Sequence, residues 1–184
     1  MYIDIVVGII MGLAVSFFSG ETSISLIAFG VFATLVPDLD FLVWLARNKW
    51  QIGRFSHEHR DIFHLPLPVG MGGGVLIAFF DPLFGLVWCL GTLAHFIHDT
   101  LDGGWGIQWL FPVYRGYFTL VSYSPKWYIR DRAEQRELAI IHGTPHWTDW
   151  KYGESWNAKF LTQLGVLGTV VIVFVTLILM SLWA

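Results

Sequence analysis

The stretch LFGLVWCLGTLAHFIHDTL, residues 83–101, joins an apolar segment of almost membrane-spanning length to ionisable side chains at its end. A spanning helix needs about 20 predominantly apolar residues. Ionisable groups in such a helix are costly unless they are paired, solvated or bound to metal. On a helix, one arc of about 100° holds all the ionisable side chains of this end: His95, His98, Asp99 and Asp102. The stretch therefore predicts a membrane helix with a functional stripe.

The composition of the whole chain supports a membrane protein. Of 184 residues, 55% are hydrophobic and 14% are charged, whereas about 25% are charged in an average soluble domain. The net charge of -3 gives no basic face, so a nucleic-acid partner is not expected. We predict a single integral membrane domain over residues 1–184, in which the lone cysteine, Cys89, is a small core hydrophobe.

Five apolar runs predict an all-α fold with about five transmembrane helices. They cover residues 3–18, 24–36, 65–80, 83–101 and 160–183. The second and third runs are short, so they can cross a membrane only together with their polar flanks. Pro37 is expected to break or restart a helix after the second run.

The basic residues predict the orientation in the membrane. All 11 Lys and Arg residues fall within residues 47–60 and 115–159. With five spans these two segments lie on the same side, and the positive-inside rule makes that side cytoplasmic. The N-terminus is then inside and the C-terminus outside. Residues 102–159 form a cytoplasmic segment whose Trp and Tyr residues suit the membrane interface.

This topology brings three polar segments, residues 38–40, 57–64 and 95–102, to the cytoplasmic face. Imidazole and carboxylate ligands together suit zinc, manganese or iron better than calcium, which prefers oxygen alone. Six ligands fit two ions, and two-metal sites commonly hydrolyse phosphate esters. The candidate ligands are the acidic residues and histidines of these segments: Asp38, Asp40, His57, Glu58, His59, Asp61, His64, His95, His98, Asp99 and Asp102. Arg60 lies next to His59, where its guanidinium can bind an anionic group.

Several of these residues also have simpler interpretations. Asp38 and Asp40 could be the N-cap and a first-turn acid of the helix after Pro37. His57 and Glu58 are more typical of supporting or solvated groups than of ligands, and His98 could be an interfacial side chain. The remaining histidines, His142 and His146, are expected at the surface.

The motifs together resemble the YdjM-type family of LexA-regulated, membrane-bound, metal-dependent hydrolases. The matching stretches are Pro37-Asp38-Leu39-Asp40, His59-Arg60-Asp61-Ile62-Phe63-His64 and His95-Phe96-Ile97-His98-Asp99. The resemblance covers residues 36–112 and implies a multi-span protein of a prokaryotic inner membrane. It also implies a metal site built from six ligands: Asp38, Asp40, His59, His64, His95 and Asp99. Asp61 and Phe63 stand where the family often has Gly and Thr, which predicts a different loop conformation and a different substrate.

We expect hydrolysis of a phosphorylated or ester-linked lipid. In that mechanism a metal-activated water attacks, Arg60 stabilises the developing negative charge, and Glu58 or His98 transfers the proton. The alternative is a metal-binding or transport protein without catalysis, but the outer halves of the apolar runs lack the polar path that transport requires. A third interpretation is a structural metal clamp that holds short helices together.

Overall fold

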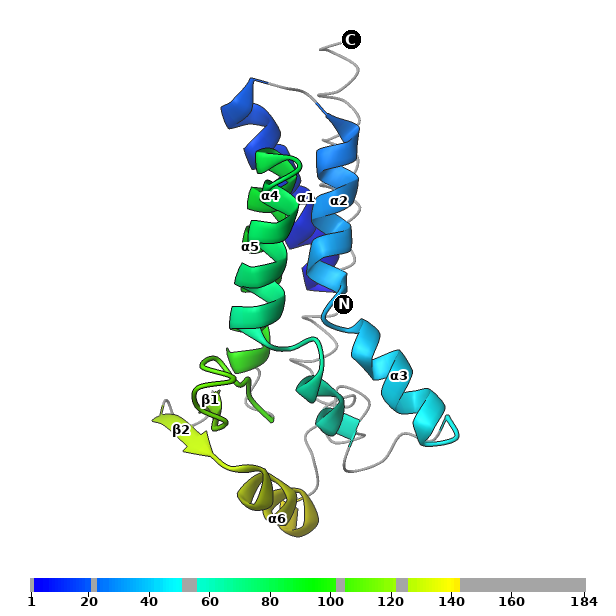
Figure 1. The fold of residues 1–184 in the computed structure, drawn as a ribbon. Coiled ribbons are helices and arrows are strands. Elements are labelled where there is room, and N and C mark those ends of the chain that lie inside the picture. The colour runs from blue at the N-terminus through cyan, green and yellow to red at the C-terminus, as the bar shows by residue number, and fades with distance from the viewer. Residues whose placement is uncertain (1, 21–22, 51–55, 102–104, 122–125, 143–184) are drawn as a thin grey trace.

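The main body of the protein is a bundle of helices that lie alongside one another (Figure 1). The computed structural model describes residues 2–20, 23–50, 56–101, 105–121 and 126–142. The bundle contains α1 (Tyr2–Ser19), α2 (Ile24–Leu35), α5 (Pro82–Leu101) and the π-helical turn η2 (Pro66–Gly72), which continues into α4 (Gly73–Ala78). The first four apolar runs therefore form helical segments. The fifth run, residues 160–183, lies outside the described residues.

Helices α1 and α2 approach each other closely at two glycines. A Cβ atom on Gly8 would lie 2.6 Å from the Gly30 carbonyl oxygen, and a Cβ on Gly30 would lie 2.2 Å from the Gly8 carbonyl oxygen. Real side chains do not tolerate such distances, so this approach requires glycine, as in many tightly packed membrane helices. Val15, Leu26 and Val87 form a buried cluster where α1 and α2 meet α5.

The chain bends at Pro37, as its sequence predicts. Helix α3 (Leu39–Arg47) follows α2 after this break and is inclined to it by 41°. Within the described residues, α2 and α3 together have the length and composition of a broken membrane span, whereas no single helix has both. Asp38 occupies the N-cap position of α3, but its side chain makes no capping hydrogen bond. Its carboxylate faces the site described below instead.

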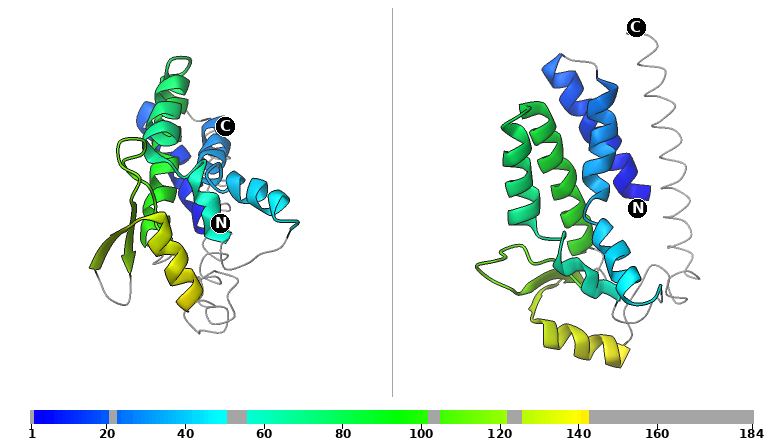
Figure 2. Two further views of the ribbon diagram at one scale, coloured as in Figure 1. Left: turned by 60° about the horizontal axis from the view of Figure 1, so that its bottom comes forward. Right: turned by 45° about the vertical axis from the view of Figure 1, so that its right-hand side comes forward.

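The all-α expectation is too narrow, because part of the chain forms a β-hairpin. Strand β1 (Tyr117–Val121) pairs antiparallel with β2 (Lys126–Arg130), and Ile107 adds a bridge to Phe118. Both strands are rich in aromatic and β-branched residues, which favour a pleated surface. Helix α6 (Arg132–His142) follows. The hairpin, α6 and α3 lie at one end of the bundle (Figure 2), so residues 102–159 contain folded elements.

Candidate metal centre

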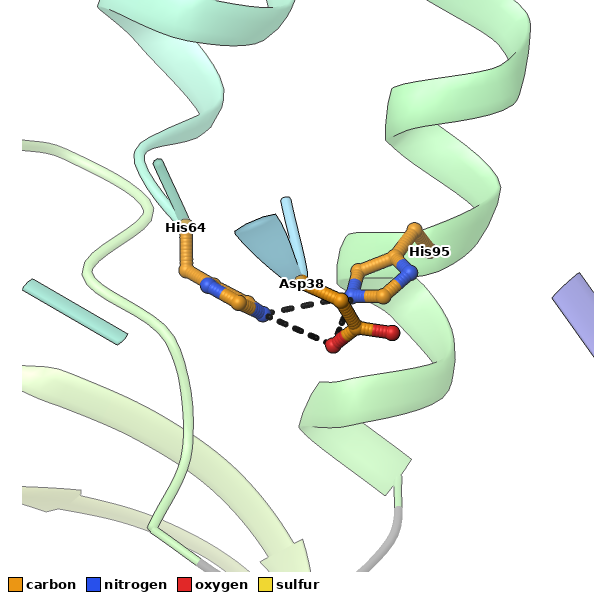
Figure 3. A group of neighbouring side chains, drawn as sticks. All are labelled: Asp38, His64 and His95. Atoms are coloured by element: carbon orange, nitrogen blue, oxygen red, sulfur yellow. Dashed lines mark hydrogen bonds and ion pairs between the residues drawn. The ribbon is translucent and has the colours of Figure 1, made fainter. Parts of the chain in front are cut away.

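Three distant segments of the chain meet at this end of the bundle. Asp38 and Asp40 come from the break between α2 and α3, and His59 and Arg60 from the 3-10 helix η1 (Ser56–Asp61). His64 lies just before η2, and His95 and Asp99 lie on consecutive turns of α5. Figure 3 shows Asp38, His64 and His95 directed toward one another. The structure thus brings together all six of the predicted ligands.

Two imidazole nitrogens of this cluster, His64 Nε2 and His95 Nε2, each lie at metal-ligand spacing from each other and from the carboxylates of Asp38 and Asp99. His64 Nε2 lies 3.2 Å from His95 Nε2, 3.9 Å from Asp38 Oδ1 and 3.1 Å from Asp99 Oδ2. His95 Nε2 lies 3.7 Å from Asp38 Oδ1 and 3.5 Å from Asp99 Oδ2. Ligands about 2.1 Å from a tetrahedral zinc ion are about 3.4 Å apart. We call these four residues the central group.

A second group overlaps the central one at His64. Asp40, His59 and His64 are close enough to hold an ion, as are Asp38, His64 and His95. His59 Nε2 lies 3.8 Å from Asp40 Oδ1, whereas His64 Nδ1 lies within hydrogen-bond distance of Asp40 Oδ2, at 2.9 Å. Because Asp40 already contacts His64 Nδ1, it also holds the ring so that Nε2 faces the central group.

The electrostatics of the cluster suit a cation. Asp40 Oδ1 is buried and accepts no hydrogen bond from the described residues, and the buried Asp99 Oδ2 faces His64 Nε2 and His95 Nε2 at 3.1 and 3.5 Å. A buried carboxylate oxygen without a partner is costly unless a cation compensates it. Three aspartates meet here, and Arg60 contributes one positive charge. The residues present therefore fit a divalent metal ion.

The cluster opens to its surroundings at Asp38. The Asp38 side chain is 40% exposed, whereas those of His64, His95 and Asp99 are buried. A catalytic metal site needs an accessible position for water or substrate. Asp38 marks the side from which such a molecule can enter.

Arg60 is buried and bonded to a residue of the central group. Its Nη2 atom lies 3.1 Å from Asp99 Oδ1, and its side chain is 6% exposed. Asp61 and Glu58 are closer to Arg60 along the chain, but their carboxylates contact Arg132 and Arg136. This contact places the guanidinium beside the donor atoms that would hold a metal.

Glu58 and Asp61 instead attach η1 to the hairpin and α6. Arg136 Nη2 donates to Glu58 Oε2 at 3.1 Å, and Arg132 Nη2 lies 2.6 Å from Asp61 Oδ2. Tyr117 donates its hydroxyl hydrogen to Asp61. Burial raises the pKa of Asp61, and burial together with the bond to Asp61 raises the pKa of Tyr117. These contacts hold the segment that carries His59 and Arg60, a connection that sequence reasoning missed.

Asp4 is a second residue that sequence reasoning missed. It lies in the first turn of α1 and is 3% exposed, with Oδ1 3.3 Å from His95 Nδ1 and 3.4 Å from His98 Nδ1. An acid inside an apolar run is itself a signal of function, and it could have identified this residue. The side chain of His98 is 38% exposed and contacts Asp4. The side chains of His57 and His142, and all of His146, lie outside the described part of the chain.

The whole chain matches a known family. The family model described as YdjM inner membrane protein matches residues 4–183. This range contains every residue of the cluster and the last apolar run. No curated protein and no solved structure matches the chain.

Proposed function

The chain belongs to the YdjM inner membrane protein family, and on that premise we propose that it is a membrane-bound, metal-dependent hydrolase of lipids. The observation that carries the proposal is the central group, in which Asp38, His64 and His95 are close enough to hold an ion and which opens at Asp38. The proposed substrate is a phosphorylated or ester-linked lipid. Such a molecule reaches an interfacial site from the bilayer, and the guanidinium of Arg60 suits an anionic head group.

The central group would hold a divalent zinc, manganese or iron ion through two imidazole nitrogens and two carboxylate oxygens. When bound, such an ion polarises a phosphoryl or carbonyl oxygen and lowers the pKa of water. A second ion between Asp40, His59 and His64 would have to displace the Asp40 contact from His64 Nδ1. We therefore propose the central group as the principal site and a second ion as an additional one.

The protein's own residues have distinct proposed roles. Asp99 holds Arg60 so that its planar fork can bind the anionic oxygens of the substrate and stabilise negative charge as it develops. His98 is 38% exposed and contacts Asp4, and its imidazole is proposed to carry a proton to or from water. Glu58 is the other candidate for proton transfer, but its bonds to Arg136 suit it better to holding η1 in place.

We also propose five membrane spans with the cluster at the cytoplasmic face. The elements that carry basic residues, α3, η1 and α6, lie at the same end of the bundle as the cluster. This arrangement supports one basic face, which the positive-inside rule assigns to the cytoplasm.

A direct test combines metal analysis with an activity screen. Full-length protein purified in detergent should contain zinc, manganese or iron and should hydrolyse a member of a panel of phospholipids and isoprenoid phosphates. Removal of the metal with a chelator should abolish hydrolysis, and its return should restore it. Metal-loaded protein that cleaves no member of the panel would instead favour the metal-binding or transport protein.

A further inference from the structure

Asp4 lies behind His95, on the side of the ring opposite the central group. Its Oδ1 atom is 3.3 Å from His95 Nδ1, whereas His95 Nε2 faces His64 and Asp38. The two nitrogens of a neutral imidazole differ, because one carries hydrogen and the other a lone pair. A carboxylate at Nδ1 favours hydrogen there, which leaves the lone pair on Nε2.

The other imidazole of the central group also has a carboxylate beyond its Nδ1 atom, at hydrogen-bond distance, whereas the Asp4–His95 contact is longer, at 3.3 Å. His64 presents Nε2 to the centre, and Asp40 Oδ2 lies 2.9 Å from its Nδ1. Each of the two imidazoles therefore has a carboxylate behind it, Asp40 from α3 and Asp4 from α1. Metal-binding histidines commonly have such a partner, which fixes the orientation of the ring and makes the ligand nitrogen more basic.

We propose that Asp4 is a positioning residue of the metal centre, which holds His95 with Nε2 directed at the ion and ties α1 to the site. The proposal rests on the proposed function in that it requires the central group to bind metal. It assigns a role to α1, which contributes no donor atom to the central group. Asp4 Oδ1 also lies 3.4 Å from His98 Nδ1, so the same carboxylate aligns the two histidines of α5.

The burial of Asp4 supports a functional rather than an incidental position. Its side chain is 3% exposed, and Asp4 is the one acidic residue of helix α1. Burial of a carboxylate is unfavourable unless it is paired, and Asp4 contacts two imidazoles. A leucine at this position would pack in the helix but would leave His95 Nδ1 without its carboxylate.

The test measures zinc affinity by competition with a chromophoric chelator, using full-length protein in detergent. Asp4→Leu should weaken zinc binding by about 10- to 100-fold, the usual effect of losing such a partner. Asp4→Asn keeps an oxygen acceptor and loses the charge, so it should weaken binding by less. The cobalt-substituted Asp4→Leu protein should also show an altered visible spectrum, because the orientation of a ligand changes.

Ser16→Ala is the matched control, because Ser16 is likewise buried in α1 and 3% exposed but lies near the other end of the helix. It should bind zinc like the wild type.

Wild-type affinity and spectrum in both Asp4 variants would overturn the role of Asp4 and leave the hydrolase proposal intact. Equal weakening by Ser16→Ala would also overturn it, by showing a general packing effect. If Asp4→Leu does not fold, an unchanged affinity in Asp4→Asn is decisive against the proposal. A wild-type protein that binds no metal would overturn both proposals.

Discussion

Replacing Arg60 with lysine separates binding of the substrate from binding of the metal. The substitution keeps one positive charge beside Asp99 and removes the planar fork of the guanidinium. Guanidinium has no lone pair and cannot be a metal ligand. The donor atoms of the central group remain, so the metal content should not change.

The structure sets the scale of the expected loss in turnover. Arg60 is 6% exposed and lies 3.1 Å from Asp99 Oδ1, so its donors act in a site that excludes most water. Loss of one positioned donor in such a site costs about 2.7 to 4 kcal/mol of transition-state stabilisation. The lysine ammonium keeps the positive charge and so retains part of this transition-state stabilisation. The smallest expected loss is therefore lower, about 1.4 kcal/mol. Since about 1.36 kcal/mol corresponds to a tenfold change in rate, turnover should fall about 10- to 1000-fold.

Arg136→Lys provides the control for this experiment. Arg136 also binds a carboxylate, that of Glu58, but its side chain is 52% exposed. Exposed ion pairs contribute at most about 1 kcal/mol, so this variant should hydrolyse at close to the wild-type rate. The assay compares metal content by mass spectrometry with initial rates in one detergent, using the lipid found in the screen. Equal rates for wild type and Arg60→Lys would refute the catalytic role of Arg60.

Three further predictions concern the metal, the topology and the hairpin. Asp38→Ala, His64→Ala and Asp99→Ala should each reduce bound metal, because a direct bond is lost and the remaining carboxylates repel each other. His142→Ala should not reduce it. Full metal content in the triple variant of Asp38, His64 and Asp99 would exclude this ligand set. Reporter fusions should place Lys49 and Arg132 on the cytoplasmic side and Ala184 outside, and opposite sides for the first two would remove the shared face. Burial and the bond to Asp61 raise the folded-state pKa of Tyr117 above 10.0. The buried, protonated hydroxyl therefore stabilises the fold fully below about pH 10, and this stabilisation is lost as the pH rises through the folded-state pKa. Thermal unfolding should therefore show wild type losing stability relative to Tyr117→Phe in alkaline solution, and parallel curves would contradict this.

The helical segments and the meeting of the three motifs follow from local sequence. The apolar runs correspond to α1, α2, η2 with α4, and α5. Ionisable residues stand at the run ends around Asp38, His64 and Asp99. Such groups are excluded from the middle of an apolar bundle. Once the polar ends of the apolar runs are assigned to one face of the membrane, the sequence predicts that their ionisable residues lie close together.

The hairpin could not be predicted in the same way. Its strands have five residues each and lie among aromatic residues that equally suit a membrane interface. The preference of a segment for β structure depends on what it packs against. Here Tyr117 is buried against Trp105 and donates to Asp61, which belongs to a distant segment.

The sequence by itself determined the ligand types, the helical runs and the break at Pro37, because these depend on residue identity and on neighbours along the chain. Only the tertiary structure decided that Arg60 contacts Asp99 rather than Asp61 or Glu58, and that Asp4 reaches His95. Acidic side chains near one another in sequence have similar chemistry, so the choice among them depends on which helix faces pack together. In this chain that packing includes the close approach of α1 and α2 at Gly8 and Gly30, and the contact of both helices with α5.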